Sequence, residues 1–339
     1  MIVRYILTFI LGTLCSFSIF GQQDPQFSQN MFNKLANNPG YAGSMGLVET
    51  SVLHRSQWIG FGDNGGSAIS TQNFSINAEL PFLYGGVGLN IVKDKIAEFS
   101  NLGLQASYAY RTQLGLGQIG MGMSFGMIQS GVDGGDFRAS DSNDPSIPTG
   151  MVSGSKIDFG AGIYYNYRGK KNALVRNEIT KLYGGAAFFH ITQPRLKYSS
   201  GNQDKLNAKL ILHAGAEIDI PKSEWSSAAS FVFMNQGPHR QTMVNLLMKA
   251  RMKNGTKYTG IHSESYFGFG LIHRFKDAIA PQILFEFGSC KIGILYAILY
   301  AITHVCFVYS IQNTSVANTL VLIAAAPIFA AIFSVFFLK

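Results

Sequence analysis

Apolar and polar residues alternate along most of the chain, over residues 46–287. In the clearest stretch, 118–128, every second residue is large and apolar: Ile119, Met121, Met123, Phe125 and Met127 alternate with Gly120, Gly122, Ser124 and Gly126. Stretches 102–110, 157–167 and 210–220 follow the same pattern. Successive side chains of a β-strand point to opposite faces, so this period of two predicts strands with one apolar and one small or polar face.

Clusters of Gly, Asn and Asp separate these stretches, for example at 64–66, 133–136, 202–204 and 253–255, and such clusters favour hairpin turns. Each stretch is about as long as the roughly 9–11 residues with which a tilted strand crosses a bilayer. We therefore predict an all-β fold, a transmembrane antiparallel β-barrel of about 14 strands. A soluble β-sandwich with an apolar core gives similar alternation and stays open as an alternative.

The faces of the predicted barrel follow from the solvent. Hydrocarbon offers backbone amides no hydrogen-bond partner, so strands can cross the membrane only as a closed barrel. The side chains that contact lipid must then be apolar, which places Gly and small polar residues on the inner face. Tyrosines near the strand ends are expected to form girdles at the two membrane interfaces: Tyr108, Tyr110, Tyr164, Tyr165 and Tyr167.

The alternation stops after Lys291, where two apolar runs begin, over 292–311 and 317–337. Each has about the 20 residues of a membrane-spanning helix, which predicts an anomalous C-terminal pair of apolar α-helices. At the other end, Arg4, an apolar stretch over 5–14 and a polar shift at 21–24 are typical of a secretory signal peptide. The predicted parts are a signal peptide (1–21), the barrel (22–294) and a two-helix membrane segment (295–339).

Composition supports a membrane protein without a disulfide framework. Only 14% of residues are charged, and 37 are glycine, against about 25% charged residues in soluble domains. The three cysteines, Cys15, Cys290 and Cys306, lie outside the alternating body, which leaves it no disulfide or thiolate metal site. The net charge of +8 is spread over turns, and an exported protein is not expected to meet nucleic acid.

Motifs for catalysis and cofactor binding are matched only in part. Residues 115–120 fit a dinucleotide-binding pattern, but a strand follows where that chemistry needs a helix N-terminus. The four aspartates within 133–144 match no calcium-loop spacing, and the seven histidines show no metal-ligand spacing. We expect no enzyme activity, no cofactor and no metal site.

Several motifs occur in a specific order: QDPQFSQ at 23–29, NNPGYAGS at 37–44, HRSQWIGF at 54–61, GLNIVKDKI at 88–96 and HITQP at 190–194. Over residues 22–294 the chain resembles the PorP/SprF family of type IX secretion-associated outer-membrane proteins. The resemblance implies a barrel in the outer membrane of Bacteroidota-like bacteria. It also implies type IX secretion components and secreted surface-protein clients, including gliding adhesins, as partners, together with a periplasmic peptidoglycan-binding partner and the lipid bilayer.

The first of these motifs suggest residues for contact with a partner or with the barrel lumen: Asp24, Gln26, Phe27, His54, Arg55, Gln57 and Trp58. Structural roles at a lumen wall or interface are the alternative for the same side chains. The segment that holds Asp24 could form a short plug or a periplasmic lead-in. Under a period of two, Arg55 and Trp58 point to opposite faces of their strand.

Residues 297–339 resemble EamA-type drug/metabolite transporters, through NTSVANT at 313–319 and AAPIFAA at 325–331. The alternative function is therefore a fragment of an inner-membrane transporter of this type, and a soluble exported β-protein is a third. A pair of apolar helices favours retention in the inner membrane, whereas a barrel must pass to the outer one. We interpret the tail as the product of a gene fusion or an assembly error.

Overall fold

The computed structural model describes residues 24–59, 67–133, 150–168, 179–197, 203–220, 223–253, 265–287 and 290–295. The predicted signal peptide and the two predicted C-terminal helices lie outside these residues. Within the described ranges, none of the helices combines the length and the apolar character needed to span a membrane.

One antiparallel sheet dominates the described residues, with thirteen strands that each pair with the next along the chain. Its strands are β1 (Glu49–Ile59), β2 (Ser67–Leu80), β3 (Gly85–Ile96), β4 (Phe99–Leu114), β5 (Gly117–Asp133), β6 (Met151–Arg168), β7 (Ile179–Phe189), β10 (Lys209–Asp219), β11 (Trp225–Gln236), β12 (His239–Lys253), β13 (Ser265–Arg274), β14 (Ala278–Phe287) and β15 (Cys290–Leu295). The all-β prediction is confirmed, with thirteen strands described here where about 14 were expected.

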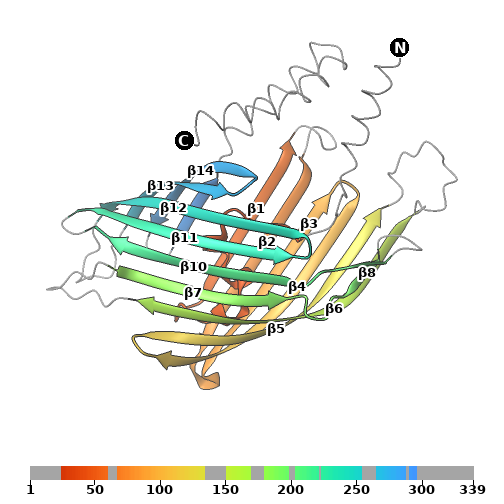
Figure 1. The fold of residues 1–339 in the computed structure, drawn as a ribbon, viewed down its shortest axis with the longest axis horizontal. Helices are drawn as coiled ribbons and strands as arrows, with labels where there is room; N and C mark the ends of the chain where they lie inside the picture. Colours follow the sequence, from red (N-terminus) through yellow and green to blue (C-terminus); the bar gives the residue numbers. More distant parts are fainter. Residues whose placement is uncertain are drawn as a thin grey trace, which may run out of the picture.

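Short elements complete the described chain. Strands β8 (Arg195–Lys197) and β9 (Gln203–Lys205) form a separate two-stranded sheet. Before β1 come three short helical turns, η1 (Asn30–Phe32), α2 (Lys34–Asn37) and η2 (Pro39–Tyr41), and η4 (Pro81–Leu83) links β2 to β3. In Figure 1 the large sheet curls strongly, so that β10–β13 lie in front of β1–β4.

The polarity of the two sheet faces is the reverse of a soluble protein. On β5, Met121, Met123 and Phe125 are 47%, 70% and 55% exposed, whereas Gly122 and Ser124 between them are buried. On β2 the buried positions are polar: Thr71, Asn73, Ser75 and Asn77. Apolar side chains therefore face outward and small or polar side chains inward, as the alternation predicts.

The tyrosines divide between the two faces. Tyr108 and Tyr110 lie on the outer face, 41% and 44% exposed, but Tyr164 is 2% exposed and faces inward. There its ring contacts Tyr41 edge to face, with the ring centroids 5.1 Å apart. The girdle prediction is wrong for Tyr164. Adjacent residues of a strand point to opposite faces, so of the pair Tyr164 and Tyr165 only Tyr165 can lie on the outer face.

Among the described residues, two apolar clusters pack the interior. The first lines β7, β10, β11 and β12 and consists of Ala187, Phe189, Ile211, Val232, Met234 and Met243. The second joins residues that precede β1 to the inner faces of β4 and β6: Leu35, Tyr41, Ala42, Ala109 and Tyr164. The residues before β1 thus supply part of the core of the sheet that follows them.

Candidate functional site

Residues 24–46, here called the internal segment, contact strands far apart in the sheet. The Asn38 side chain donates a hydrogen bond to the Ile163 carbonyl of β6 at 2.9 Å. The backbone N–H of Gly43 donates to Asn77 of β2 at 3.1 Å, and Arg274 of β13 donates to the Ser28 hydroxyl at 3.4 Å. The strands β2, β6 and β13 lie far apart in the strand order. Because one short segment contacts all three, the sheet must curve around it.

Residues 38–45, the turn of the internal segment, lie directly on glycines of the sheet. A Cβ atom added at Gly86, Gly122 or Gly162 would come within 3.0 Å of backbone or side-chain atoms of the turn. Gly43 in the turn itself has a φ of 71°, which glycine adopts readily. The small inward residues of the alternating pattern therefore form the surface on which this turn is seated.

Polar side chains satisfy the buried backbone of the turn. Asn38, which is fully buried, accepts a hydrogen bond from the Gly40 N–H at 2.9 Å. Arg111 of β4 donates to the Gly40 carbonyl at 3.2 Å, and Arg168 of β6 donates to the Ser44 carbonyl at 3.1 Å. Buried carbonyls require donors, so these two arginines fix the turn as well as pack against it.

Residues 24–31, the strap of the internal segment, begin with an ionic cluster. The Asp24 carboxylate lies 2.7 Å from His190 Nε2 and 3.1 Å from Lys209 Nζ. His190 follows β7, and its Nδ1 lies 3.0 Å from the Asp158 carboxylate of β6. Its φ of 55° is unusual for a residue other than glycine. The cluster joins one end of the strap to β6, β10 and the chain after β7.

Mutual attraction sets the charge states in this cluster. Burial raises the pKa of the Asp24 carboxyl, but His190 and Lys209 outweigh burial and hold the pKa well below its usual range. Burial lowers the pKa of His190, but attraction to Asp24 and its bonds to both carboxylates raise the pKa to about 9. At neutral pH, Asp24 is therefore an anion and His190 a cation.

The pH dependence of stability follows from this raised pKa. A shift from 6.5 to about 9 corresponds to about 3 kcal/mol that is fully present below pH 6.5 and is lost as pH rises through 9. Thermal unfolding in detergent between pH 6 and 10 should therefore show less alkaline loss in His190→Asn than in the unchanged protein. Equal pH profiles for the two proteins would contradict the assignment.

The comparison with His190→Asn is needed because Lys34 titrates in the same range. Burial lowers the pKa of this lysine, which lies in α2, to about 7. A lowered lysine pKa makes the folded protein more stable as pH rises, which opposes the effect of His190. Lys34 is present in both proteins, so the difference between their profiles reports on His190.

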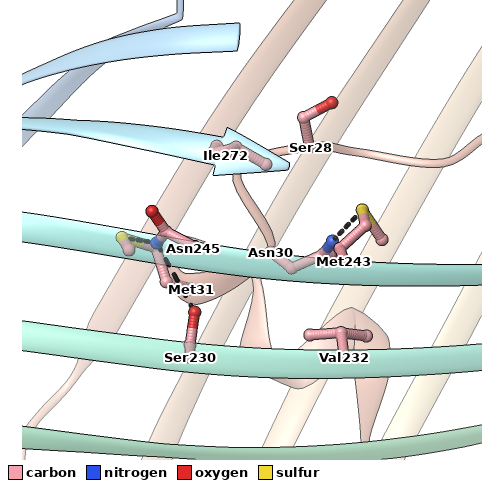
Figure 2. Close-up of a pocket in the computed structure, with 8 residues that line it drawn as sticks. All are labelled: Ser28, Asn30, Met31, Ser230, Val232, Met243, Asn245 and Ile272. Carbon is pink, nitrogen blue, oxygen red and sulfur yellow. Dashed lines mark hydrogen bonds between the residues drawn. The ribbon is translucent and has the colours of Figure 1, made fainter. Parts of the chain in front are cut away.

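The rest of the strap is held by separate hydrogen bonds along its length. Arg55 of β1 donates to the Gln26 carbonyl at 2.7 Å. Farther along, the amides of Asn30 and Asn245 bond to methionine sulfur, at 3.3 Å to Met243 and 3.5 Å to Met31 (Figure 2). Beside these contacts is a cavity of about 10 Å³, about the size of one water molecule and too small for a cofactor.

The structure brings some of the predicted site residues together and separates others. Arg55 contacts Gln26 on the inner side of the sheet, whereas Asp24 binds His190 and Lys209. Phe27 is partly buried in the strap, and Gln57 is partly buried in β1. His54 lies on the outer face, exposed, with a ring nitrogen 2.8 Å from the Ser56 hydroxyl. Trp58 belongs to β1, but its side chain lies outside the described atoms.

Sequence reasoning missed the partners of these residues. His190 and Asn38 lie in the motifs 190–194 and 37–44, which gave a signal without a role. Asp158 stands in the alternating stretch 157–167 and Lys209 directly before the stretch 210–220, and neither gave a signal. Their contacts with Asp24 and His190 depend on how the sheet curves, because Asp24 and Lys209 are 185 positions apart in the chain.

A row of opposite charges crosses the inner face of the later strands. Lys181 of β7 and Lys249 of β12 both pair with Glu217 of β10, the first at 2.9 Å. Glu286 of β14 lies 3.7 Å from Lys249 and 3.1 Å from Lys291 of β15. Buried ions need partners of opposite sign, and this row connects β15 to the rest of the sheet.

The described residues show no arrangement for metal chemistry. Within the ranges that the structure covers, no three His, Cys, Asp or Glu side chains gather closely enough to hold a metal ion. Several charged groups of the interior instead pair with one another, as Glu217 does with Lys181 and Lys249. What this site can do is hold, or release, a segment of polypeptide inside the curved sheet.

Comparison with known families identifies two regions. The family model described as "Type IX secretion system membrane protein PorP/SprF" matches residues 19–301. The model of the "EamA-like transporter family" matches residues 264–339. Both resemblances stated from the sequence are confirmed, although the second match begins earlier than residue 297. A search of curated proteins finds no match.

Proposed function

Because the chain belongs to the PorP/SprF family of type IX secretion system membrane proteins, we propose that it is a non-enzymatic outer-membrane barrel that serves type IX secretion. The sheet closes around the internal segment, and its apolar face contacts lipid. Closure is part of the proposal because hydrocarbon offers no partner to the backbone groups of an open sheet edge.

The apolar outer face is the observation that supports this placement best. Large apolar side chains are exposed along the whole sheet, from Val52 of β1, 72% exposed, through Met123 of β5 to Leu246 of β12, 58% exposed, and Ile279 of β14, 52% exposed. A soluble monomer rarely exposes so continuous an apolar surface, because contact with water is unfavourable. Lipid requires such a surface, and a polar interior is usual for barrels of this kind.

The partners that we propose are type IX secretion components and the surface proteins that this system exports or anchors, including adhesins of gliding bacteria. A periplasmic peptidoglycan-binding protein is a further proposed partner. Among the site residues, His54 faces outward, whereas Asp24, Gln26 and Arg55 act in the interior. We assign Asp24, Gln26 and Arg55 to retention of the internal segment.

The match to the EamA-like family supports a second candidate, a fragment of an inner-membrane drug/metabolite transporter. Its first part, 264–301, overlaps the PorP/SprF match. In this overlap the described residues form β13, β14 and β15, which continue the antiparallel sheet. The barrel proposal therefore accounts better for the residues common to both matches.

Membrane fractionation separates the candidates. We expect the full chain in the outer membrane, with gel mobility that changes on heating, because a closed sheet stays folded in detergent until it is heated. Recovery in the inner membrane would favour the transporter fragment. A soluble periplasmic protein would overturn both candidates.

A further inference from the structure

The internal segment is held by two different kinds of contact. The turn (38–45) lies on sheet backbone at Gly86, Gly122 and Gly162, and no described glycine of the sheet makes such a contact with the strap (24–31). At the end of the strap, beside a cavity, Asn30 donates to the Met243 sulfur of β12, and the Met31 sulfur accepts from Asn245. Sulfur is a weak acceptor. These bonds therefore hold the end of the strap less firmly than the close backbone contacts hold the turn.

Charge holds the beginning of the strap. Asp24 is the only ionisable side chain in DPQFSQNM, the sequence of residues 24–31. Its carboxylate binds both His190 and Lys209, whose side chains are 8% and 12% exposed. Charge-assisted bonds between desolvated groups are strong. Two further cations contact the strap, Arg55 at the Gln26 carbonyl and Arg274 at the Ser28 hydroxyl, and both end on a neutral oxygen.

The surface beneath the strap is mixed in chemistry. It includes Val232 of β11, Met243 and Asn245 of β12, and Ile272 of β13 (Figure 2). All four are buried in this structure. Removal of the strap would expose this wall to solvent, while the turn would still cover β3, β5 and β6.

We propose that the strap is a releasable gate, which leaves the inner wall of β11–β13 when the contact of Asp24 with His190 and Lys209 is broken, while the turn stays seated. The gate rests on the proposed function in that it controls access to the interior of the proposed barrel. Its release changes which inner surface a partner can reach, without unfolding the sheet.

Thiol labelling of buried cysteines tests the gate in the full chain. The three native cysteines are replaced by serine, and a single cysteine is introduced by Val232→Cys under the strap or by Ala109→Cys, which packs with the turn residues Tyr41 and Ala42. A water-soluble maleimide is then added to each protein, with and without Asp24→Asn. We expect Asp24→Asn to speed labelling at position 232 at least tenfold and to leave position 109 protected.

Glu217→Gln is the matched control. Glu217 is also an inward carboxylate with two cationic partners, Lys181 and Lys249, but neither it nor they bond to the strap. We expect this substitution to change labelling at neither position. Lys209→Gln is a second way to weaken the Asp24 contact, and it should speed labelling at position 232 if Asp24→Asn does not fold.

The two labelling positions distinguish release of the strap from loss of the whole internal segment. Labelling of positions 232 and 109 together would overturn the proposal, because the whole segment would then leave or the sheet would unfold. Unchanged labelling at both positions would overturn it as well. Labelling does not depend on secretion, so the two proposals can be tested separately. The gate can be disproved in a protein that fractionates with the outer membrane, and the outer-membrane location can be disproved in a protein whose labelling shows the gate.

Discussion

Gly122→Val is expected to destabilise the folded protein by about 1–3 kcal/mol or more, the usual cost of overpacking. A Cβ atom at this position would come within 3.0 Å of the backbone of Pro39 and Gly40, so the valine must displace the turn. Valine otherwise favours strands over glycine, and a loss of stability therefore reports the collision. The measurement is the temperature at which the heat-modifiable band disappears.

Gly103→Val provides the control for this substitution. Gly103 lies in β4, the strand next to β5, and a Cβ atom there would meet only the Val92 carbonyl oxygen, at 3.9 Å. We expect its stability to be unchanged or slightly higher. An equal loss in both variants would show that valine disturbs the sheet generally and that the turn is not seated as described.

Phe125→Arg is expected to cost about 2–4 kcal/mol of stability in lipid vesicles, the range for a cation at the middle of a lipid-facing strand. Phe125 is 55% exposed on the outer face of β5. If this face met water, a charge would be tolerated or would improve solubility. Urea unfolding of vesicle-embedded protein measures the difference.

Leu116→Arg makes the same comparison at the end of the hairpin. Leu116 lies between β4 and β5 and is 83% exposed. Close to the interface an arginine costs only about 0–1 kcal/mol, so we expect this variant to resemble the unchanged protein. Equal stability of the Phe125→Arg and Leu116→Arg proteins would remove the support for a lipid-facing sheet.

The alternation of apolar and polar residues predicted the strands well, because the face that each side chain occupies depends only on its position along its own strand. The outward positions of 118–128 follow directly from the period of two, and the structure places them as predicted. The same rule, applied strictly, would have corrected Tyr164, since Tyr164 and Tyr165 cannot share a face. Aromatic character alone therefore does not place a tyrosine in a girdle, because the register of the strand decides which face it occupies.

The candidate site was harder to predict because its contacts are not local. Asp24 could be singled out from a motif, but its partners Lys209 and His190 lie 185 and 166 positions away. Gly86, Gly122 and Gly162 were expected to face inward as small residues. The turn (38–45) reaches these glycines only because the whole sheet curves, and the alternation of residues does not predict that curvature.

The position of the internal segment also constrains the order of assembly. The segment precedes β1, yet Ser28 contacts Arg274, a residue 246 positions later. Contacts of such long separation form late, because the intervening chain must first lose its freedom. In the proposed barrel, pairing of the last strands encloses the internal segment, so we expect this segment to take its place while the wall is still open.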